Sequence, residues 1–370
     1  MKFSCEKQIL GEAINNVLPA VSSKSTIIAL EGILMDCKNN QLSLTGYNLE
    51  LGITKTIPVT GIEEGSIILN ASLLSGIINK MPNGTVELAS DEKLLTVINC
   101  ADVEFTILGL DAGEYPDIPQ VNGDRQFEIP HFLLKNMISQ TLFAVAQTDQ
   151  NPVHTGSLFD IQEKTLCLVS VDGYRLALRK EKINVDDPFK FVVPGKTLSE
   201  MMKLLSRLAP EEDETVRVNV SNKHICFCIS GYVLISRLLE GEFLDYKNAI
   251  PKEGQTTVTL ETRAFLDSIN RASIIINERA KSPIRCTFSE NQVKLFCETA
   301  LGKISDSLPA EITGPEVSIG FNNKYMADAL KASECDKIRI EINGPVSPMK
   351  LLPAEEEDFL FLVLPVRLKS

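Results

Sequence analysis

The chain has 370 residues, of which 44% are hydrophobic and 23% charged, with a formal net charge of −12 at pH 7. This composition is that of an ordinary soluble globular protein with two or three domains. No stretch approaches the roughly 20 apolar residues that cross a bilayer, and residues 1–7 lack an apolar signal core. We therefore expect a cytoplasmic protein that has no contact with a membrane.

Apolar residues recur at helical spacing in six windows, and each window predicts a helix with one buried face. The windows and their apolar residues are 6–19 (Ile9, Leu10, Ala13, Ile14, Val17, Leu18), 71–81 (Leu73, Leu74, Ile77, Ile78, Met81), 131–146 (Leu134, Met137, Ile138, Leu142), 197–209 (Leu198, Met201, Met202, Leu205, Leu208), 262–276 (Phe265, Leu266, Ile269) and 322–332 (Tyr325, Met326, Ala329, Leu330).

Short segments rich in Val, Ile and Thr lie between these windows and are separated by Asn, Gly, Asp and Lys turns, which predicts strands. Examples are 41–44, 67–69, 85–89, 94–98, 166–171, 215–220, 225–229 and 338–342. Two helices and about eight strands for each third of the chain indicate an α+β fold, with helices covering one face of antiparallel sheet.

The same order of elements occurs three times. A strand-to-helix start at Phe3 recurs at Phe127 and Val258, and a second one at Asn70 recurs at Pro194 and Phe321. Both Phe3 to Phe127 and Asn70 to Pro194 span 124 residues, and two markers that move together are hard to obtain by chance. We predict three copies of one domain, at 1–121, 125–250 and 255–370.

Charge is unevenly distributed along the chain. The six helix windows hold nine Lys or Arg and five Asp or Glu, a net +4, so the remainder of the chain carries −16. A solvated helix face with some lysines is the plain interpretation of this difference. The alternative is a set of basic helix faces that meet a polyanion, inside a protein whose other surfaces are acidic.

The sequence contains no recognisable catalytic motif. We find no Walker loop, no HExxH and no GxSxG, and the three histidines form no base–nucleophile pair. Asp172 and Tyr174 could be imagined as an acid and a base, but we favour a turn that Asp172 caps and in which Gly173 has a positive φ. We therefore predict a protein that is not an enzyme and needs no cofactor.

The nine cysteines show no paired spacing, which is typical of reduced thiols. His224, Cys226 and Cys228 alternate and would point to one face of a strand, where they could form the corner of a metal site. No CxxC motif or fourth ligand accompanies them. The favoured interpretation is two small cysteines packed on a strand, and we predict no metal site.

Four stretches resemble one known family. They are 42–50 (LSLTGYNLE), 171–177 (VDGYRLA), 191–196 (FVVPGK) and the C-terminal 363–368 (VLPVRL). In this order, on a threefold repeat, they resemble the bacterial DNA polymerase III β subunit family, the sliding clamps, and the resemblance runs along the whole chain.

The resemblance implies a head-to-tail homodimer with six domains in a ring, helices lining the hole and sheets forming the wall. Double-stranded DNA would thread the hole and be held topologically, without base readout. The basic residues that we expect to contact DNA are Lys24, Lys80, Lys196, Lys203 and Arg207. A second basic residue is common in the family where this chain has Gly195, which weakens that contact here.

The resemblance also implies a cleft between the second and third domains, where short apolar peptides of partner proteins dock. The expected partners are the replicative polymerase catalytic subunit, the clamp loader and repair polymerases. The residues of this cleft would be His154, Gly156, Val171, Gly173, Tyr174, Arg175, Leu176, Leu244, Ala249, Leu362, Leu364, Pro365 and Val366. His154, Leu244 and Val366 differ from common family usage, and a fully buried C-terminal strand is the competing interpretation.

For the dimer interface, the resemblance places Phe105 and Ile107 of one chain against Ile274 and Ile275 of the other. Packing of the two isoleucines within the third domain is the alternative. Two other classes of protein stay open on the sequence. One is a three-domain enzyme or ligand-binding protein with sites between its domains, and the other is an adaptor that binds peptides and never encircles DNA.

Overall fold

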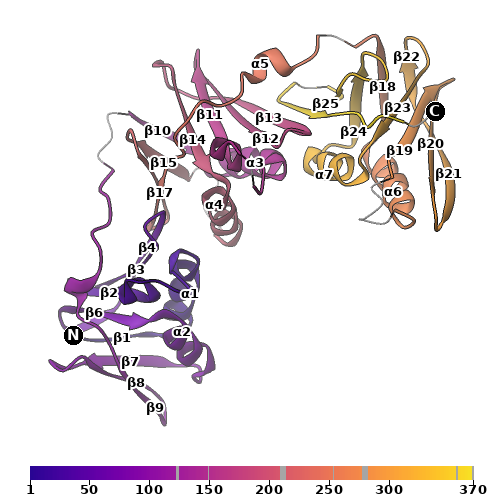
Figure 1. Cartoon of the computed structure of the whole chain (residues 1–370). Helices are drawn as coiled ribbons and strands as arrows, with labels where there is room; N and C mark the ends of the chain where they lie inside the picture. Colours follow the sequence, from indigo (N-terminus) through magenta and orange to yellow (C-terminus); the bar gives the residue numbers. More distant parts are fainter. Residues whose placement is uncertain are drawn as a thin grey trace. The chain divides into compact units, whose positions relative to one another are not determined.

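The computed structural model describes residues 1–121, 125–148, 150–208, 214–252, 254–276, 282–355 and 357–368 (Figure 1). The chain divides into two compact units. The first combines Met1–His131 with Glu200–Leu238, and the second combines Phe132–Ser199 with Leu239–Ser370. The division falls inside the second repeat, and each unit is described by itself below.

The first repeat has a helix after its first strand and another after its sixth. Its elements are β1 (Lys2–Glu6), α1 (Lys7–Val17), β2 (Gly32–Lys38), β3 (Gln41–Tyr47), β4 (Leu51–Pro58), β5 (Thr60–Glu63), β6 (Gly65–Asn70), α2 (Ala71–Lys80), β7 (Thr85–Ser90), β8 (Leu95–Cys100) and β9 (Val103–Leu108).

The third repeat follows the same order, and in the second repeat the second helix comes after the fifth strand. The second contains β10 (Arg125–Pro130), α3 (His131–Thr141), β11 (Gly156–Gln162), β12 (Thr165–Val171), β13 (Arg175–Lys182), β14 (Phe189–Pro194), α4 (Gly195–Arg207), β15 (Thr215–Val220), β16 (His224–Ile229) and β17 (Tyr232–Arg237), and the short α5 (Tyr246–Ala249) follows it. The third contains β18 (Thr256–Glu261), α6 (Thr262–Ser273), β19 (Ile284–Ser289), β20 (Gln292–Thr299), β21 (Gly302–Pro309), β22 (Glu311–Thr313), β23 (Val317–Phe321), α7 (Asn323–Ser333), β24 (Lys337–Ile342), β25 (Met349–Pro353) and β26 (Phe359–Val363).

The α+β class is confirmed, and all six predicted helices are present. Residue 209, at the end of one predicted window, lies outside the described residues. The predicted core faces need a correction at Ile9 and Leu73, whose side chains are 43% and 48% exposed. The buried stripe of α1 is narrower than the apolar pattern, because one face of the helix packs on the sheet while Ile9 lies beyond its margin.

Local chemistry explains where two of the helices begin. The Asn70 side chain accepts a hydrogen bond from the Leu73 backbone N–H, and the Asn322 side chain accepts from Lys324 and Tyr325. An asparagine at the position before the first helical residue satisfies backbone donors that have no partner within the helix. The second repeat has Pro194 at this position instead.

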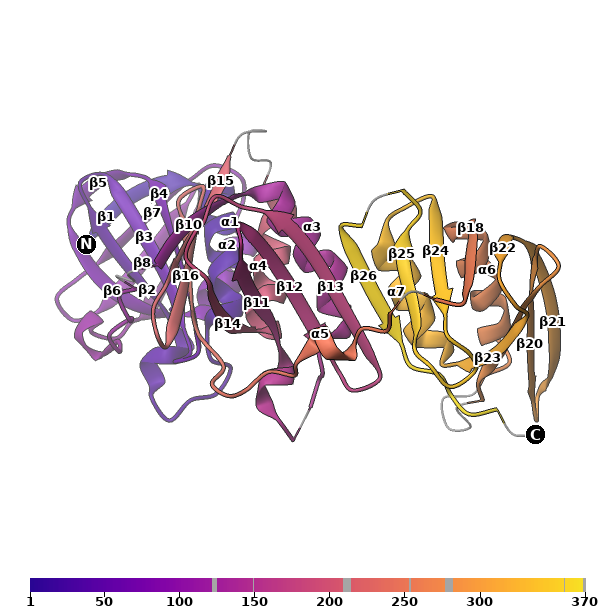
Figure 2. The ribbon, with the colours of Figure 1, turned by 90° about the horizontal axis from the view of Figure 1, so that it is seen from above.

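Each unit contains one long antiparallel sheet to which two repeats contribute strands. In the first unit the order is β10-β15-β16-β17-β4-β3-β2-β6, beside the sheet β5-β1-β7-β8-β9. In the second unit it is β14-β11-β12-β13-β26-β25-β24-β18-β22, beside the sheet β21-β20-β19-β23. Figure 2 shows β11, β12 and β13 continuing directly into β26, β25 and β24.

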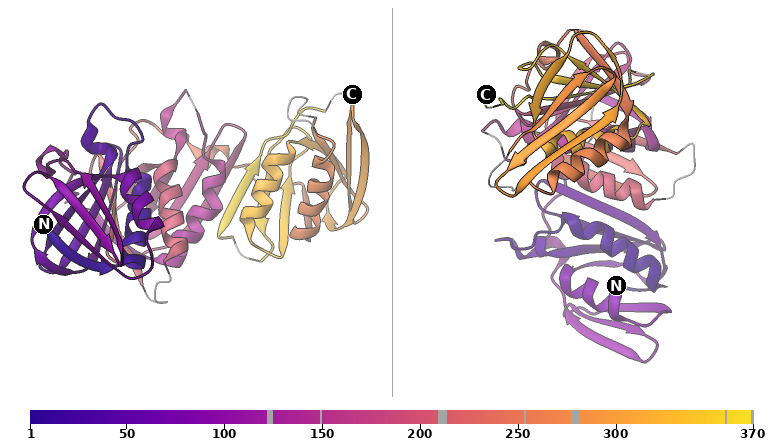
Figure 3. Two further views of the ribbon diagram at one scale, coloured as in Figure 1. Left: turned by 90° about the horizontal axis from the view of Figure 1, so that it is seen from below. Right: turned by 90° about the vertical axis from the view of Figure 1, so that its right-hand side faces the viewer.

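The helices of the third repeat lie side by side, as the left panel of Figure 3 shows for α6 and α7. The core of this repeat lies between these helices and the strands, around Phe265, Phe288, Phe321 and Phe361, none of which is exposed. Helices and sheets are thus layered about one hydrophobic core, as the α+β pattern predicts.

The joints between repeats follow one rule. The last strand of the second repeat, β17, pairs with β4 of the first, and the last strand of the third, β26, pairs with β13 of the second. In the described part of the chain, two strands at equivalent positions remain without such a partner. They are β9, the last strand of the first repeat, which corresponds to β17 and β26, and β21 of the third repeat, which corresponds to β4 and β13. Each lies at the edge of its sheet, where one side of its backbone lacks a ladder partner among the described residues.

Candidate functional site

The turn between β12 and β13 precedes the joint of the second and third repeats. The Asp172 carboxylate accepts hydrogen bonds from the backbone N–H groups of Tyr174 (3.0 Å) and Arg175 (3.1 Å), and Gly173 has φ +82°. The capped turn predicted from the sequence is therefore confirmed. Its effect is structural, because the cap directs the Tyr174 side chain outward and the Arg175 side chain inward.

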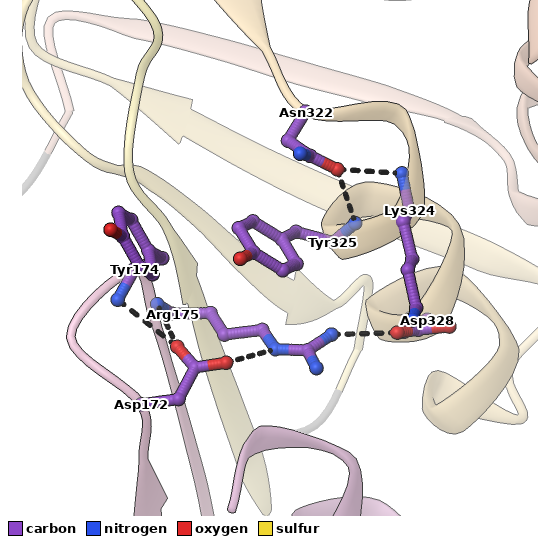
Figure 4. A network of polar contacts seen from close by, with 7 residues as sticks. All are labelled: Asp172, Tyr174, Arg175, Asn322, Lys324, Tyr325 and Asp328. Carbon is purple, nitrogen blue, oxygen red and sulfur yellow. Dashed lines mark hydrogen bonds and ion pairs between the residues drawn. The ribbon is translucent and has the colours of Figure 1, made fainter. Parts of the chain in front are cut away.

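Arg175 ties this turn to the third repeat (Figure 4). Its Nε donates to Asp172 at 2.9 Å, and its Nη1 donates to Asp328 on α7 at 2.7 Å. The guanidinium also lies over the rings of Tyr325, 4.6 Å from its centroid, and Phe143, 5.4 Å away. Only 9% of the Arg175 side chain is exposed, so its charge is matched almost entirely by groups within the protein.

Two aromatic rings continue from this ion pair towards the surface. Tyr174 stacks on Tyr325 with a centroid distance of 5.7 Å and an interplanar angle of 24° (Figure 4). Tyr174 is 60% exposed, whereas Tyr325 is half-buried, and burial, followed by the nearby Asp172 carboxylate, raises the pKa of Tyr325. The stack presents a flat apolar face beside a fixed guanidinium.

An apolar cluster lies next to the turn in the same sheet. Leu176 and Leu362 are directly paired across β13 and β26, and both are buried. They pack with residues of the second repeat and the segment after it, Leu158, Val169, Leu178, Val192 and Tyr246, with the partly buried Leu239, Phe243 and Ile250, and with the partly buried Leu360 of β26. Val171, at the end of β12, is buried as well.

The C-terminal segment is held by backbone hydrogen bonds on both sides of its proline. The Leu364 N–H donates to the Tyr174 carbonyl at 2.9 Å, and the Val366 N–H donates to the Gly320 carbonyl at 2.8 Å. A Cβ at Gly320 would lie 2.7 Å from the Val366 carbonyl oxygen, so only glycine lets this segment approach so closely. Leu364 is 39% exposed, and Pro365 and Val366 are half-buried.

The remaining residues predicted for the cleft lie around this cluster with different exposures. The His154 ring meets Phe243 edge to face at 5.5 Å, and Phe243 belongs to the cluster. Leu244 is 43% exposed, and Ala249 is exposed at the end of α5. Gly156 is buried, and a Cβ there would lie 2.4 Å from the Val193 carbonyl oxygen, so a larger residue would not fit.

The sequence analysis missed the contributions of α7 to this site. Asp328 and Tyr325 bind Arg175 from 153 and 150 residues away in the chain, and Phe143 contacts it from the turn after α3. Tyr325 was assigned only to the core stripe of its helix. Periodicity places a residue on a helix face, but it does not say which side chain of another repeat that face meets.

Three family models match the chain in succession: the DNA polymerase III β subunit N-terminal domain over residues 1–119, its central domain over 128–245 and its C-terminal domain over 247–367. The chain belongs to this family, the β sliding clamps. Members of the family are non-catalytic processivity subunits of DNA polymerase III, which implies DNA and polymerase as partners.

The similarity extends over full lengths. The β sliding clamp of Bacillus subtilis (strain 168) is 34% identical, with 99% of this chain and 100% of the relative covered. The crystal structure of the B. subtilis clamp has a TM-score of 0.95 at 34% identity, and a putative DNA polymerase III β subunit from Eubacterium rectale ATCC 33656 has 0.93 at 33%. Both alignments cover 100% of each chain.

Three of the basic residues expected to contact DNA lie on one helix. Lys196, Lys203 and Arg207 are exposed on α4, and their spacing of seven and four residues puts them on one helix face. Lys203 is paired with Glu200 at 2.8 Å. Lys24, in the loop before β2, and Lys80, at the end of α2, are exposed too.

Arg207 is fixed in place by the first repeat. Its Nη1 donates to the side-chain Oδ1 of Asn16 at 2.7 Å, and the side-chain Nδ2 of Asn16 donates to the Tyr232 hydroxyl at 2.6 Å. The Lys55 ammonium lies 4.0 Å from the Tyr232 ring centroid. These contacts order the Arg207 guanidinium, which would otherwise sample many rotamers. The Lys55 ammonium adds a second positive charge to the same network.

The residues expected at the dimer interface differ in burial. Phe105 is 39% exposed on β9, while Ile107 is 9% exposed. Ile274 is 80% exposed, and Ile275 is partly buried against the core of the third repeat. The alternative of packing within the third domain therefore describes Ile275 better than Ile274.

Among the described residues, no helix is long and apolar enough to cross a membrane. All nine cysteines, each within the described ranges, are free thiols. The sequence analysis expected reduced thiols, and one of them, Cys167, packs against the apolar cluster around Leu176 and Leu362.

Proposed function

We propose that two copies of this chain close head to tail into a ring of six domains that encircles duplex DNA and tethers a polymerase to it. The pattern of strand pairing between the repeats carries this proposal. Within the chain, β17 pairs with β4 and β26 pairs with β13, and these strands hold equivalent positions in their repeats. The third equivalent pair is β9 of the first repeat and β21 of the third, and these two strands are not paired with each other. A second copy supplies both missing partners, so that the β9 and β21 edges are covered and the ring closes. The domain boundaries 1–121, 125–250 and 255–370 belong to this proposal.

The register of the missing joint follows from the other two. Ile235 pairs with Gly52 at the first joint, and Leu362 pairs with Leu176 at the second. Matching the hairpins of the three repeats makes Lys303 equivalent to Gly52 and Leu176, and Thr106 equivalent to Ile235. Thr106 of one copy should therefore lie opposite Lys303 of the other.

This register brings exposed apolar side chains together. It places Phe105 opposite Ile304 and Leu108 opposite Leu301. Leu108 and Leu301 are largely exposed, at 68% and 72%. Ile304 packs against the core of the third repeat. Large apolar side chains on an edge strand are a liability in a monomer, so their presence on both strands supports a covered interface. Ile274 would add to it from the end of α6.

Thiol cross-linking tests the register directly. In a chain with Thr106→Cys and Lys303→Cys, a short bismaleimide should join both interfaces and give a covalent dimer on denaturing gels. Each single variant should give only monomer at the same dose, because each new thiol then faces a lysine or threonine. The native chain, with nine thiols of its own, sets the background. A double variant that behaves like the single variants would refute the register.

We assign the DNA contacts to Lys24, Lys80, Lys196, Lys203 and Arg207. Their common features are exposure and, for the three on α4, a shared helix face. The six long helices as observed contain ten Lys or Arg and four Asp or Glu, in a chain with 37 basic and 49 acidic residues. Few phosphate contacts on an acidic protein keep the affinity for DNA low, which suits a ring that must slide.

The phosphate contacts predict a measurable salt dependence. Lys196→Ala combined with Lys203→Ala should weaken binding to an open duplex severalfold, equally for all base sequences. The slope of log affinity against log salt should fall by about two, roughly one for each lost phosphate contact. Lys164→Ala, at an exposed lysine of the β11–β12 hairpin, is the matched control and should change neither quantity. An unchanged slope in the double variant would remove both lysines from the DNA surface.

The second site of the proposed function is a cleft for partner peptides, made by the residues named above around Leu176, Leu362 and the Tyr174 stack. Its support is a buried apolar floor with exposed apolar side chains at its rim and a fixed guanidinium beside it. Such an arrangement anchors two or three apolar side chains of a short peptide. We propose the polymerase catalytic subunit, the clamp loader and repair polymerases as the proteins that carry such peptides.

A further inference from the structure

Two cysteines on β16, Cys226 and Cys228, lie close together and have no role in the proposed function. Cys226 and Cys228 alternate along the strand and point to the face opposite the buried Ile225 and Phe227. Their sulfur atoms are 3.6 Å apart and share a hydrogen bond. Cys226 is 6% exposed and Cys228 is half-buried, so a small ion or reagent can reach the pair from the Cys228 side.

The backbone disfavours a disulfide between them. Residues two apart on an extended strand have Cα atoms about 6.8 Å apart, at the upper limit for a disulfide, and their parallel Cβ atoms are far more than the usual ~3.8 Å apart. The strand cannot bend to shorten this distance, because β16 is hydrogen-bonded to β15 on one side and to β17 on the other.

A single bound ion fits the same geometry without distortion. Two thiolates at about 2.3 Å from a tetrahedral zinc ion are about 3.8 Å apart. The observed separation of 3.6 Å differs from this by only a few tenths of an ångström, which small rotations of the side chains supply. The pair is therefore spaced as two ligands of one ion.

Arg217 on β15 is the direct cross-strand neighbour of Cys228. The sequence analysis considered a metal corner of His224, Cys226 and Cys228 and rejected it. Among the described residues no third His, Cys, Asp or Glu completes such a group.

We propose that Cys226 and Cys228 form a dithiolate site that chelates one soft divalent ion of the Zn2+ type, with the remaining coordination positions open to solvent or to a ligand from another molecule. Soft thiolate sulfur selects such ions over Mg2+ or Ca2+. An ion that binds the folded strand more tightly than the unfolded chain stabilises the fold by mass action. The site shares no residue with the proposed DNA contacts or peptide cleft and does not depend on either.

Cadmium provides the test, because its bonds to thiolate sulfur give an absorption band in the ultraviolet. Titration of the reduced full-length chain with Cd2+ should give this band with one equivalent bound. Cys228→Ser should weaken the binding at least tenfold, and Cys226→Ser should do the same. Cys335→Ser removes a half-buried thiol on another repeat and should leave the titration unchanged. Melting curves without metal show whether each variant is folded.

Phenylarsine oxide gives an independent readout, since its arsenic condenses with two neighbouring thiols and releases one water. The native chain should gain one adduct in its intact mass that survives excess monothiol, and Cys228→Ser should gain none. The proposal is overturned if Cys228→Ser binds Cd2+ as the native chain does. It is also overturned if the folded native chain shows neither the band nor the adduct.

Discussion

Phe105→Arg is expected to raise the dissociation constant of the ring by about a thousandfold. Phe105 lies on the edge strand β9, and the proposed register sets it opposite Ile304 and next to Lys303. Loss of a central aromatic contact costs about 2 kcal/mol or more, and the arginine would be buried near a lysine. A closed dimer contains this contact twice, so the cost is about 4 kcal/mol, which corresponds to about three powers of ten in Kd. Sedimentation equilibrium over a range of chain concentrations measures it.

The control for this variant lies on the opposite edge of the same sheet. Ile62 on β5 is a large apolar residue with 56% exposure, and Ile62→Arg adds the same charge to the same unit. It should leave the dissociation constant within a factor of two or so, because surface substitutions away from a contact have small effects. Equal loss of dimer in both variants would mean that added charge, and not the β9 edge, is responsible. An unaffected dimer in Phe105→Arg would exclude this edge as the interface.

Arg175→Ala is expected to lower the free energy of unfolding by about 3 kcal/mol. The arginine is the shared partner of Asp172 and Asp328, and its removal leaves two partly buried carboxylates close to each other without a counter-charge. It also removes the cation that lies over the Tyr325 and Phe143 rings. Urea unfolding followed by circular dichroism should show the second unit unfolding at a lower denaturant concentration, with an unchanged slope.

Arg263→Ala is the matched control, because Arg263 forms an ion pair with Asp267 at 3.2 Å while its own side chain is 83% exposed. Solvent-exposed pairs at this spacing contribute about 0.5 kcal/mol or less. Adding Asp328→Asn to Arg175→Ala should recover part of the lost stability, since it removes one of the uncompensated charges. If both arginine variants unfold alike, the ion pairs of Arg175 contribute no more than surface ones.

Some features follow from the sequence because they depend on neighbours in the chain. Apolar spacing located all six long helices, and the recurrence of Phe3 at Phe127 exposed the repeat. The turn at Asp172 and Gly173 could be predicted as well, because aspartate caps backbone N–H groups two or three residues on and glycine tolerates a positive φ. Family membership rests on motifs that are contiguous in sequence, such as 171–177.

Other features were decided by the tertiary structure. The β11–β12 and β19–β20 hairpins turn at Glu163–Lys164 and Glu290–Asn291, and both residues of each turn have a positive φ. Glutamate and lysine do not favour this conformation, so the pairing of the flanking strands imposes it. The exposure of Ile9 and Leu73 likewise depends on how wide a stripe of each helix meets the sheet.

The functional sites likewise combine features that the sequence determines with features that depend on the tertiary structure. The sequence by itself determined the repeat, the family, and the candidate residues that lie in contiguous motifs, because local spacing and residue chemistry set them. Only the tertiary structure brought Asp328 and Tyr325 to Arg175, anchored Arg207 on Asn16, and set the sulfur atoms of Cys226 and Cys228 at 3.6 Å. The contacts of Arg175 and Arg207 join segments that the pairing of β13 with β26 and of β17 with β4 brings together, whereas the sulfur separation depends on the side-chain orientations on one strand, β16. Strand pairing between distant segments depends on the packing of the whole sheet, and no local pattern in the chain specifies it.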